Sequence, residues 1–293
     1  MIAFSIPFLL NFLVGTLING KEIAAHITDS LQKRIVALRR KKRIPSLVVV
    51  LVGNNPASRT YVRMKGQVAK KIGVQFTLLE YPEKITTKNL VSEINRIQKE
   101  QAPSGMILQL PLPSHLDTTA ALNAIDPTRD IDCLTFENIG RLVMKQARFF
   151  PPTAEAVMKI LQNLKVSFPG KNVTIVGVGP LVGKPLTVML MNERASVTTV
   201  NSATKNFKEK CLAADIIVTA IGKQNTIRGD MVRDSAIVVD AGIDFTKDGK
   251  VIGDVNVEEV LKHASAVTPT PGGVGPLTIA CLLENTVIAA EST

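Results

Sequence analysis

The sequence contains no tryptophan and only two tyrosines, and its three cysteines and three histidines are widely scattered. Base stacking on aromatic rings supplies much of the affinity for single-stranded nucleic acid, so the shortage argues against a nucleic-acid partner. The cysteines show no paired spacing, which favours a reducing compartment, and neither residue type has the spacing of metal ligands. We therefore expect a cytoplasmic protein without a metal site.

Acidic residues are also in deficit, because 35 Lys and Arg face 25 Asp and Glu and give a formal charge of +10. A strongly basic protein attracts anions. The basic residues are spread along the chain, and the one cluster, residues 39–43, fits the solvated end of a helix. We expect an anionic small-molecule substrate and, from the length of 293 residues, two domains.

No charged residue occurs in the first 18 positions. A membrane span needs about 20 apolar residues, and this run is interrupted by polar residues, a proline and a glycine. It has neither the basic start nor the small-residue cleavage site of a secretory signal. We interpret residues 1–17 as an apolar N-terminal extension or a surface-packed segment, and we expect no membrane span.

Short apolar runs alternate with amphipathic segments in the first half of the chain, which predicts parallel βαβ units in an α/β fold. The expected elements are a helix over 21–41, strands over 47–52, 74–81 and 105–110, and a helix from Thr87, its cap, to about 100. Ligands of parallel sheets bind beyond the carboxyl ends of the strands. The loops after these strands are therefore expected to form one rim.

One helix carries a lysine among apolar residues. Asn55 and Pro56 predict its start and Gly73 its end. Lys65 is the only charge on its apolar stripe, with Tyr61 one turn before it. Two readings stay open: the lysine extends its ammonium into water, or desolvation lowers its pKa and makes the amine available for proton transfer.

The loop at residues 126–133 carries three aspartates. They are either turn formers or include a carboxylate that accepts two N–H groups of a ligand.

A second α/β series begins with an expected strand over 173–177. Gly177, Gly179 and Gly183 lead from it into a helix, which is typical of a dinucleotide phosphate site but also of simple turn and packing needs. Further strands are expected over 196–200, 216–220 and 236–240. An acidic residue that binds an NAD ribose would be expected at the end of the strand over 196–200. Residues 200–205 contain no acidic residue.

Prolines and glycines are dense at residues 268–276, before an apolar helix that is expected to end near residue 290. This segment is either a rigid loop whose backbone closely approaches a ligand, or a linker that returns the chain to the first domain.

Together these stretches resemble the bifunctional methylenetetrahydrofolate dehydrogenase / methenyltetrahydrofolate cyclohydrolase family, from about Ile18 to Thr286. The most specific pieces are VGNNPASRTYVRMK (52–65), GMILQLPLP (105–113), DPTRDID (126–132) and TPTPGGVGPLT (268–278). The resemblance implies oxidation of 5,10-methylenetetrahydrofolate by hydride transfer to NADP, then hydrolysis of the 5,10-methenyl product to 10-formyltetrahydrofolate. It also implies a homodimer.

The domain organisation that this resemblance implies is two α/β domains with a cleft between them. A folate-binding catalytic domain spans 18–150, and a helix over 275–293 packs back on it. A Rossmann-like NAD(P)-binding domain spans 151–274.

The resemblance also implies site residues. Lys65 matches the lysine of the hydrolytic step and Gln109 the glutamine bonded near it, while Tyr61 matches the tyrosine that stacks on folate and Asp132 the aspartate that holds the pterin edge. The catalytic set is thus Lys65, Gln109, Asp132 and Tyr61. Further substrate contacts are expected from Ser58, Pro271, Gly272 and Gly273, and cofactor contacts from Gly177, Val178, Gly179, Gly183, Ser202 and Ile243.

The chain departs from the family pattern in several places. Cys133 stands where a glycine usually follows the pterin aspartate, and Val178 and Asn201 replace residues near the adenosine ribose. NADP is the cofactor that the resemblance implies, and the changes at Val178 and Asn201 leave NAD as an open alternative. Two rival functions remain: a Rossmann oxidoreductase acting on another anionic substrate without hydrolysis, and a non-catalytic binding protein, against which the four retained polar residues argue.

Overall fold

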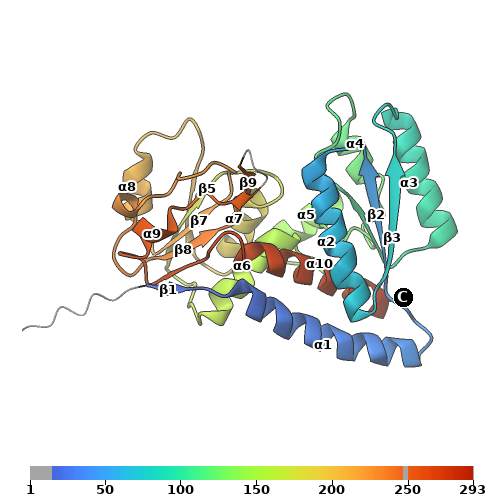
Figure 1. Ribbon diagram of the computed structural model, residues 1–293, viewed down its shortest axis with the longest axis horizontal. Helices are drawn as coiled ribbons and strands as arrows, with labels where there is room; N and C mark the ends of the chain where they lie inside the picture. The colour runs from blue at the N-terminus through green and yellow to red at the C-terminus, as the bar shows by residue number, and fades with distance from the viewer. Residues whose placement is uncertain (1–14, 247–249, 293) are drawn as a thin grey trace, which may run out of the picture.

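The computed structural model describes residues 15–246 and 250–292, which form two lobes, each built on a parallel sheet (Figure 1). The first lobe has three strands in the order β3-β2-β4. Its strands and the helices around them are β2 (Ser46–Val52), β3 (Gln75–Tyr81), β4 (Gly105–Leu108), α2 (Pro56–Ile72), α3 (Thr87–Gln101), α4 (Thr118–Asn123) and α5 (Phe136–Val143).

The second lobe has six parallel strands in the order β1-β11-β8-β7-β5-β6. They are β1 (Thr16–Leu17), β5 (Asn172–Val176), β6 (Ser196–Val200), β7 (Ile216–Thr219), β8 (Ile237–Asp240) and β11 (Ala266–Val267). The other elements here are α7 (Gly183–Asn192), α8 (Phe207–Leu212), α9 (Val257–Val260), a 3-10 turn (Gly229–Met231) and an antiparallel pair, β9 (Asp244–Phe245) with β10 (Val251–Ile252).

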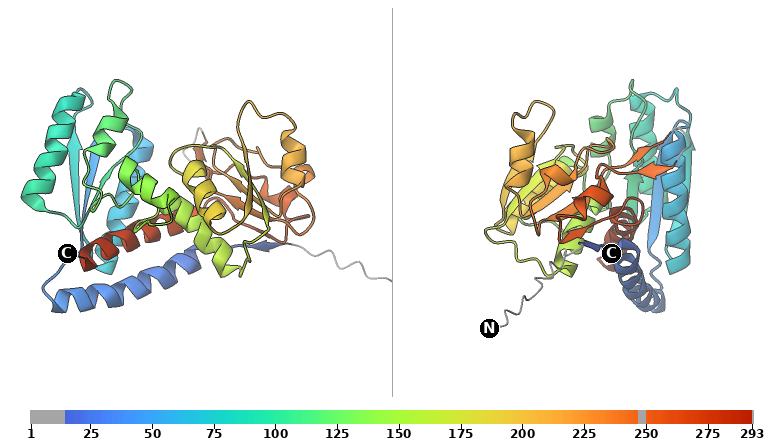
Figure 2. Two further views of the ribbon diagram at one scale, coloured as in Figure 1. Left: turned by 180° about the vertical axis from the view of Figure 1, so that it is seen from behind. Right: turned by 60° about the vertical axis from the view of Figure 1, so that its left-hand side comes forward.

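Three helices join the lobes: α1 (Gly20–Arg40), α6 (Pro152–Asn163) and α10 (Val274–Glu291). Helices α1 and α10 begin beside the second lobe and run side by side beneath the first (Figures 1 and 2). Helix α10 packs against α1 and α6. Its first turns, at Leu277 and Ala280, belong to the core of the second lobe, and its later residues Leu283 and Val287 belong to the core of the first. In the part of the chain that the structure describes, α10 is the one helix long and apolar enough to cross a membrane, but two-thirds of it is buried inside the protein.

The expected α/β fold is confirmed, and most element boundaries lie within a residue or two of expectation. The cap of α3 is Thr86, whose hydroxyl accepts from the Asn89 N–H at 3.2 Å, and Thr87 is the first helical residue. Strand β4 ends at Leu108 and not at residue 110, although the Gln109 N–H still donates to the Val50 carbonyl at 2.8 Å.

The start of the chain bears on the expected extension over 1–17. Residues 1–14 lie outside the described residues, whereas Gly15 to Leu17 belong to the second lobe. Strand β1 pairs in parallel with β11, and the Thr16 N–H donates to the Ser265 carbonyl at 2.9 Å. The last residues of the extension therefore add an edge strand to the larger sheet.

Candidate active site

Helix α2 places Lys65 at the edge of its buried face. The Asn55 side chain caps the helix by accepting from the Ser58 N–H at 3.0 Å, and Gly73 ends it in the left-handed conformation. Val62 and Ala69 are fully buried in the core, while Lys65 is half-buried. The lysine Nζ donates to Oε1 of Gln109 at 3.0 Å.

The carbonyl of Leu110 joins the parts of this site. Gln109 directly follows β4, and its Nε2 donates to that carbonyl at 2.8 Å, which leaves Oε1 directed at Lys65. The buried Ser58 hydroxyl donates to the same carbonyl at 3.4 Å. Three of the expected residues, Ser58, Lys65 and Gln109, thus meet at the carboxyl ends of β2 and β4.

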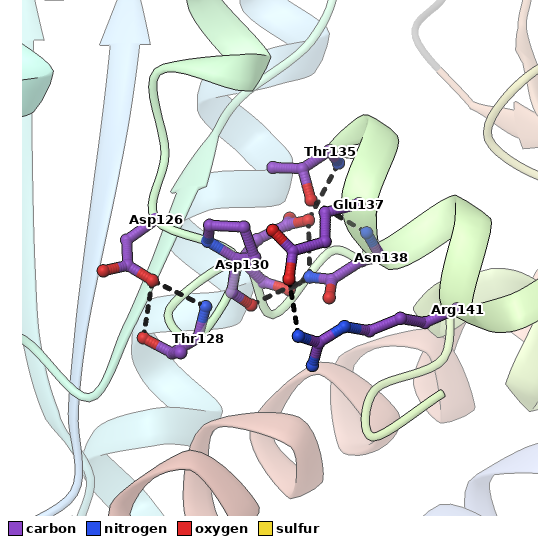
Figure 3. A network of polar contacts seen from close by, with 8 residues as sticks. Asp126, Thr128, Asp130, Thr135, Glu137, Asn138 and Arg141 are labelled. Carbon is purple, nitrogen blue, oxygen red and sulfur yellow. Dashed lines mark hydrogen bonds and ion pairs between the residues drawn. The ribbon is translucent and has the colours of Figure 1, made fainter. Parts of the chain in front are cut away.

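Two of the three aspartates in the 126–133 loop, Asp126 and Asp130, are hydrogen-bonded to nearby residues (Figure 3). Asp126 accepts from the N–H and hydroxyl of Thr128 at 2.8 and 2.6 Å. Asp130 is buried, and it accepts from the Thr135 N–H at 2.8 Å and from the Asn138 side chain at 2.9 Å. These two carboxylates hold the loop and the start of α5, as turn formers do.

Asp132 is the remaining carboxylate. Among the described residues no hydrogen bond reaches its side chain, which instead lies within the electrostatic reach of Lys65. Its oxygens are therefore free to accept from a ligand.

Burial dominates the ionisation of this site. It lowers the pKa of Lys65, an effect that the Asp132 charge opposes. Burial also raises the pKa of Asp132 to about 6, which Lys65 opposes and Asp130 reinforces. Tyr61, half-buried one turn before Lys65, has its pKa raised by burial and stays protonated. An amine that loses its proton more readily than usual is suited to proton transfer.

The glycine turn of the second lobe connects β5 to α7. Gly177 has φ +97°, and a Cβ on Gly183 would lie 1.9 Å from the Gly177 carbonyl oxygen, so the helix begins tightly against the strand. Among residues 15–246 and 250–292, no atom lies within 4 Å of where a Cβ on Gly179 would be, and no side chain caps α7. An uncapped helix start beside bare backbone fits a pyrophosphate.

The other expected cofactor residues flank this turn. Val178 is half-buried within it, Ser202 is exposed in the loop after β6, and Ile243 is 37% exposed after β8. Asn201 is engaged locally, because its side-chain oxygen accepts from the Ala203 N–H at 2.9 Å.

The expected substrate residues Pro271, Gly272 and Gly273 connect β11 to α10. A Cβ on Gly20 would lie 1.8 Å from the Gly273 carbonyl oxygen, so this loop packs on the first turn of α1. No contact recorded among the described residues joins the loop to Lys65.

A surface hollow also lies between α2 and β3, with Arg63, Lys70 and Phe76 in its lining, and Lys65 does not line it. In the described part of the chain, no three His, Cys, Asp or Glu side chains gather as metal ligands would.

Sequence reasoning missed two buried carboxylates of the second lobe, Asp240 and Asp254. An aspartate at the end of an apolar strand was the only signal for the first of them.

Two family profiles match the chain. One, described as the catalytic domain of tetrahydrofolate dehydrogenase/cyclohydrolase, covers residues 18–132, and the other, described as the NAD(P)-binding domain, covers 151–293. The chain belongs to the tetrahydrofolate dehydrogenase/cyclohydrolase family. This confirms the resemblance noted in the sequence.

Individual members of the family align over nearly their whole length. The bifunctional protein FolD of Nautilia profundicola is 44% identical over 277 residues, which cover 94% of this chain and 98% of the relative. The structure of the bifunctional FolD enzyme from Campylobacter jejuni is 39% identical, with a TM-score of 0.92 and coverage of 94% and 99%. That of the Trypanosoma brucei enzyme, complexed with NADP and an inhibitor, is 35% identical, with a TM-score of 0.91 and coverage of 95% and 98%.

Proposed function

We propose that this chain oxidises 5,10-methylenetetrahydrofolate with NADP and then hydrolyses the 5,10-methenyl product to 10-formyltetrahydrofolate at one folate site around Lys65. The observation that carries the proposal is the hydrogen bond from the half-buried Lys65 amine to Gln109, 44 residues away. Surface lysines are seldom held in this way, and a fixed, desolvated amine is what proton transfer during hydrolysis requires.

In the hydrolytic step, water attacks the electrophilic methenyl carbon and must lose a proton as the carbon–oxygen bond forms. A neutral Lys65 amine accepts that proton, and burial makes the neutral form more accessible by lowering the pKa. The carbon–nitrogen bond to N5 then breaks as the hydroxyl of the adduct gives up its proton and N5 takes one up, leaving the formyl group on N10. Gln109 does not ionise, so its role is to orient the amine.

Two further residues hold the substrate. The Asp132 carboxylate, free of hydrogen bonds within the described chain, accepts from the amide and amino groups of the pterin ring, which present two N–H donors side by side. Tyr61 lies on the same helix as Lys65 and offers its ring for stacking on the folate. Ser58 and the loop at 271–273 complete the substrate contacts in this proposal.

The second lobe holds the cofactor. When bound there, NADP would supply the hydride acceptor for oxidation of the substrate's methylene carbon. The bare backbone at Gly179 and the uncapped start of α7 fit its pyrophosphate. Ser202 and Lys205 are exposed after β6 and present a hydroxyl and a cation where the ribose 2′-phosphate of NADP would lie.

We also propose domain limits of 18–150 with the helix at 275–293 for folate, and 151–274 for the cofactor. A cytoplasmic location agrees with three unpaired, buried cysteines. Assembly as a homodimer is part of the same proposal and follows from the family alone.

A spectrophotometric assay tests the function. Methenyltetrahydrofolate is followed as it forms from methylenetetrahydrofolate with NADP or NAD, and its decay is followed separately after direct addition. We expect formation with NADP and enzyme-dependent decay. NAD(P) binding without any turnover of folate would favour the rival oxidoreductase, and the absence of both steps in a folded protein would refute the proposal.

A further inference from the structure

Asp254 is a fully buried carboxylate that fixes the loop after β7. It accepts from the Thr219 hydroxyl at 2.6 Å, from the Ile221 N–H at 2.9 Å and from the Lys223 N–H at 2.7 Å. Three donors on one carboxylate leave the loop backbone little freedom, because breaking any of these hydrogen bonds leaves a buried polar group without a partner.

Asp240 does the same for the loop after β8. Its carboxylate accepts from the Gly242 N–H at 3.0 Å and from the Val255 N–H at 3.1 Å, next to Asp254 in sequence. Burial raises its pKa to about 6. Its own N–H donates to the buried Thr268 hydroxyl at 2.7 Å. The two carboxylates therefore hold the loops at the carboxyl ends of β7 and β8, and the Asp240 N–H links them to Thr268 after β11.

Glycines make room for both carboxylates. A Cβ on Gly242 would lie 2.1 Å from the Asp254 carboxylate, and one on Gly253 would lie 2.0 Å from Asp240. The backbone at Gly242 and at Gly253 is therefore packed directly against a carboxylate, in addition to the hydrogen bonds.

The loops held in this way present two large apolar side chains to solvent, Ile221 at 47% exposure and Ile243 at 37%. The Ile221 side chain lies 3.2 Å from where a Cβ on Gly177 would be, so it borders the glycine turn. The Ile243 carbonyl lies 2.8 Å from the corresponding point on Gly222, which sets the two loops side by side. Apolar side chains on a rigid rim are suited to cover a flat apolar ring.

The strand order tells which end of the cofactor this rim meets. The pyrophosphate belongs at the turn between β5 and α7, and the adenosine ribose at the end of β6. Strands β7 and β8 lie on the other side of β5. The nicotinamide end therefore extends toward Ile221 and Ile243.

We propose that Asp254, together with Asp240, is a positioning residue for hydride transfer. By fixing the backbone at 221–223 and 241–243, the carboxylates hold Ile221 and Ile243 as a rigid seat for the nicotinamide ring. The inference rests on the proposed function, but it assigns the alignment of the cofactor to two side chains that lie beneath the seat and do not face it.

Asp254→Asn tests the proposal, because an amide keeps the shape but has only one acceptor oxygen for donors that now use two. We expect kcat for dehydrogenation to fall about tenfold or more, since a misplaced reacting atom costs rate steeply. Hydrolysis of added methenyltetrahydrofolate should stay within about twofold, because that step needs no cofactor alignment. Thr219→Val removes one donor and should give a smaller loss of the same kind.

Asp215→Asn is the matched control. Asp215 also accepts from a backbone N–H, that of Asn172 at 2.7 Å, but at the opposite end of the same sheet. It should leave both activities unchanged.

Two readouts separate positioning from misfolding of the second lobe. Affinity for adenosine 2′,5′-bisphosphate, which occupies only the adenosine end, should be unchanged in Asp254→Asn. Hydrogen exchange in the cofactor-free Asp254→Asn protein should accelerate at the Ile221 and Lys223 amides, which donate to Asp254, and not elsewhere in the sheet.

Loss of affinity for the bisphosphate, or faster exchange throughout the lobe, in both Asp254→Asn and Thr219→Val would show a general structural role and overturn the proposal. Unchanged dehydrogenase kcat in Asp254→Asn would overturn it as well. A wild-type protein without dehydrogenase activity would instead refute the proposed function, so the two failures are distinguishable.

Discussion

Lys65 and Asp132 are oppositely charged, half-buried side chains that affect each other's ionisation without a hydrogen bond between them in the described structure. Burial drives both toward their neutral forms, and each charge partly offsets that tendency in the other. The site therefore holds an amine that gives up its proton more easily than usual and a carboxyl group that takes one up near pH 6.

The first prediction concerns Lys65→Met, which keeps the length and apolar contacts of the side chain but removes the nitrogen. Hydrolysis of methenyltetrahydrofolate should fall by on the order of 10²-fold or more, the usual effect of losing a positioned acid–base group. Dehydrogenation should persist at a substantial fraction, because hydride transfer requires alignment and no proton carrier. The measurement is methenyltetrahydrofolate, which should accumulate in the coupled assay.

Arg63→Met is a suitable control, since Arg63 is exposed on the other face of α2. It should leave both rates unchanged. If both activities fall together in a folded Lys65→Met protein that still binds folate, the lysine positions the substrate and does not carry the proton. Unchanged hydrolysis would favour the reading in which the ammonium simply extends into water.

The second prediction follows from the Asp132 pKa of about 6, raised from 3.8. Because the ionised carboxylate accepts the pterin N–H groups, folate affinity should fall as the pH drops through about 6. In Asp132→Asn the affinity should be lower and nearly independent of pH between 5 and 8. Isothermal titration with a folate analogue measures both, and a wild-type affinity that does not change across pH 6 would contradict the assignment.

The same shift predicts a stability effect of opposite sign. A carboxyl group whose pKa is higher in the folded state favours folding below pH 3.8, and this advantage is lost as the pH rises through about 6. At pH 8 the ionised Asp132 should then cost the free protein up to about 3 kcal/mol, at roughly 1.4 kcal/mol per pKa unit. Urea unfolding should show Asp132→Asn to be more stable than the wild type at pH 8, with a smaller gap at pH 4.

Cofactor choice is the third prediction. No acidic residue lies at 200–205 to repel a 2′-phosphate, and Ser202 and Lys205 are exposed there, but the Asn201 side chain is occupied within its own turn. We expect NADP to be used with weaker discrimination against NAD than is usual in the family. A preference above about a thousandfold, roughly 4 kcal/mol, would mean that a phosphate clamp has been missed.

A substitution sharpens this test. Ser202→Asp should lower kcat/KM for NADP relative to NAD, because it sets a negative charge against the phosphate. The control is Ser196→Asp, at the amino end of β6, the strand that precedes Ser202. It should not change kcat/KM for either cofactor. Equal losses with both cofactors in Ser202→Asp would place the ribose elsewhere.

The fourth prediction concerns the start of the chain. Removing residues 1–14 should leave turnover unchanged, since no expected ligand lies there. A chain that starts at Ile18 also loses strand β1 and its hydrogen bonds from Gly15 and Thr16 to Leu261 and Ser265. It should unfold more easily, by about 1 kcal/mol per bond, and keep its turnover. Loss of folate turnover in the folded protein would make this segment part of the active structure.

Local signals in the sequence predicted much of the first lobe. Asn55, Pro56 and Gly73 bound α2 because capping and left-handed backbone depend on the residue itself. The lysine on an apolar stripe was visible for the same reason, since helical spacing fixes which side chains share a face. That spacing placed Lys65 on the buried face, and the structure refines this to its edge.

Contacts between distant segments were beyond such signals. Nothing local distinguishes Asp130, which holds the loop, from Asp132, which is left free, because the difference depends on donors brought in by α5. Residue spacing alone did not pair Lys65 with Gln109; only the resemblance suggested it. The Asp254 contacts come from a loop that precedes it by more than 30 residues, and strand β1 is too short for any periodicity to reveal.

The three bridging helices have a consequence for how the protein is made. The core of the first lobe needs Leu283 and Val287 of α10, which emerge from the ribosome only after the whole second lobe. During synthesis the three-stranded sheet is therefore left with part of its apolar face uncovered until the last helix arrives. Nascent chains halted just before residue 274 should consequently bind chaperones through the first lobe, although every strand of that lobe has already been translated.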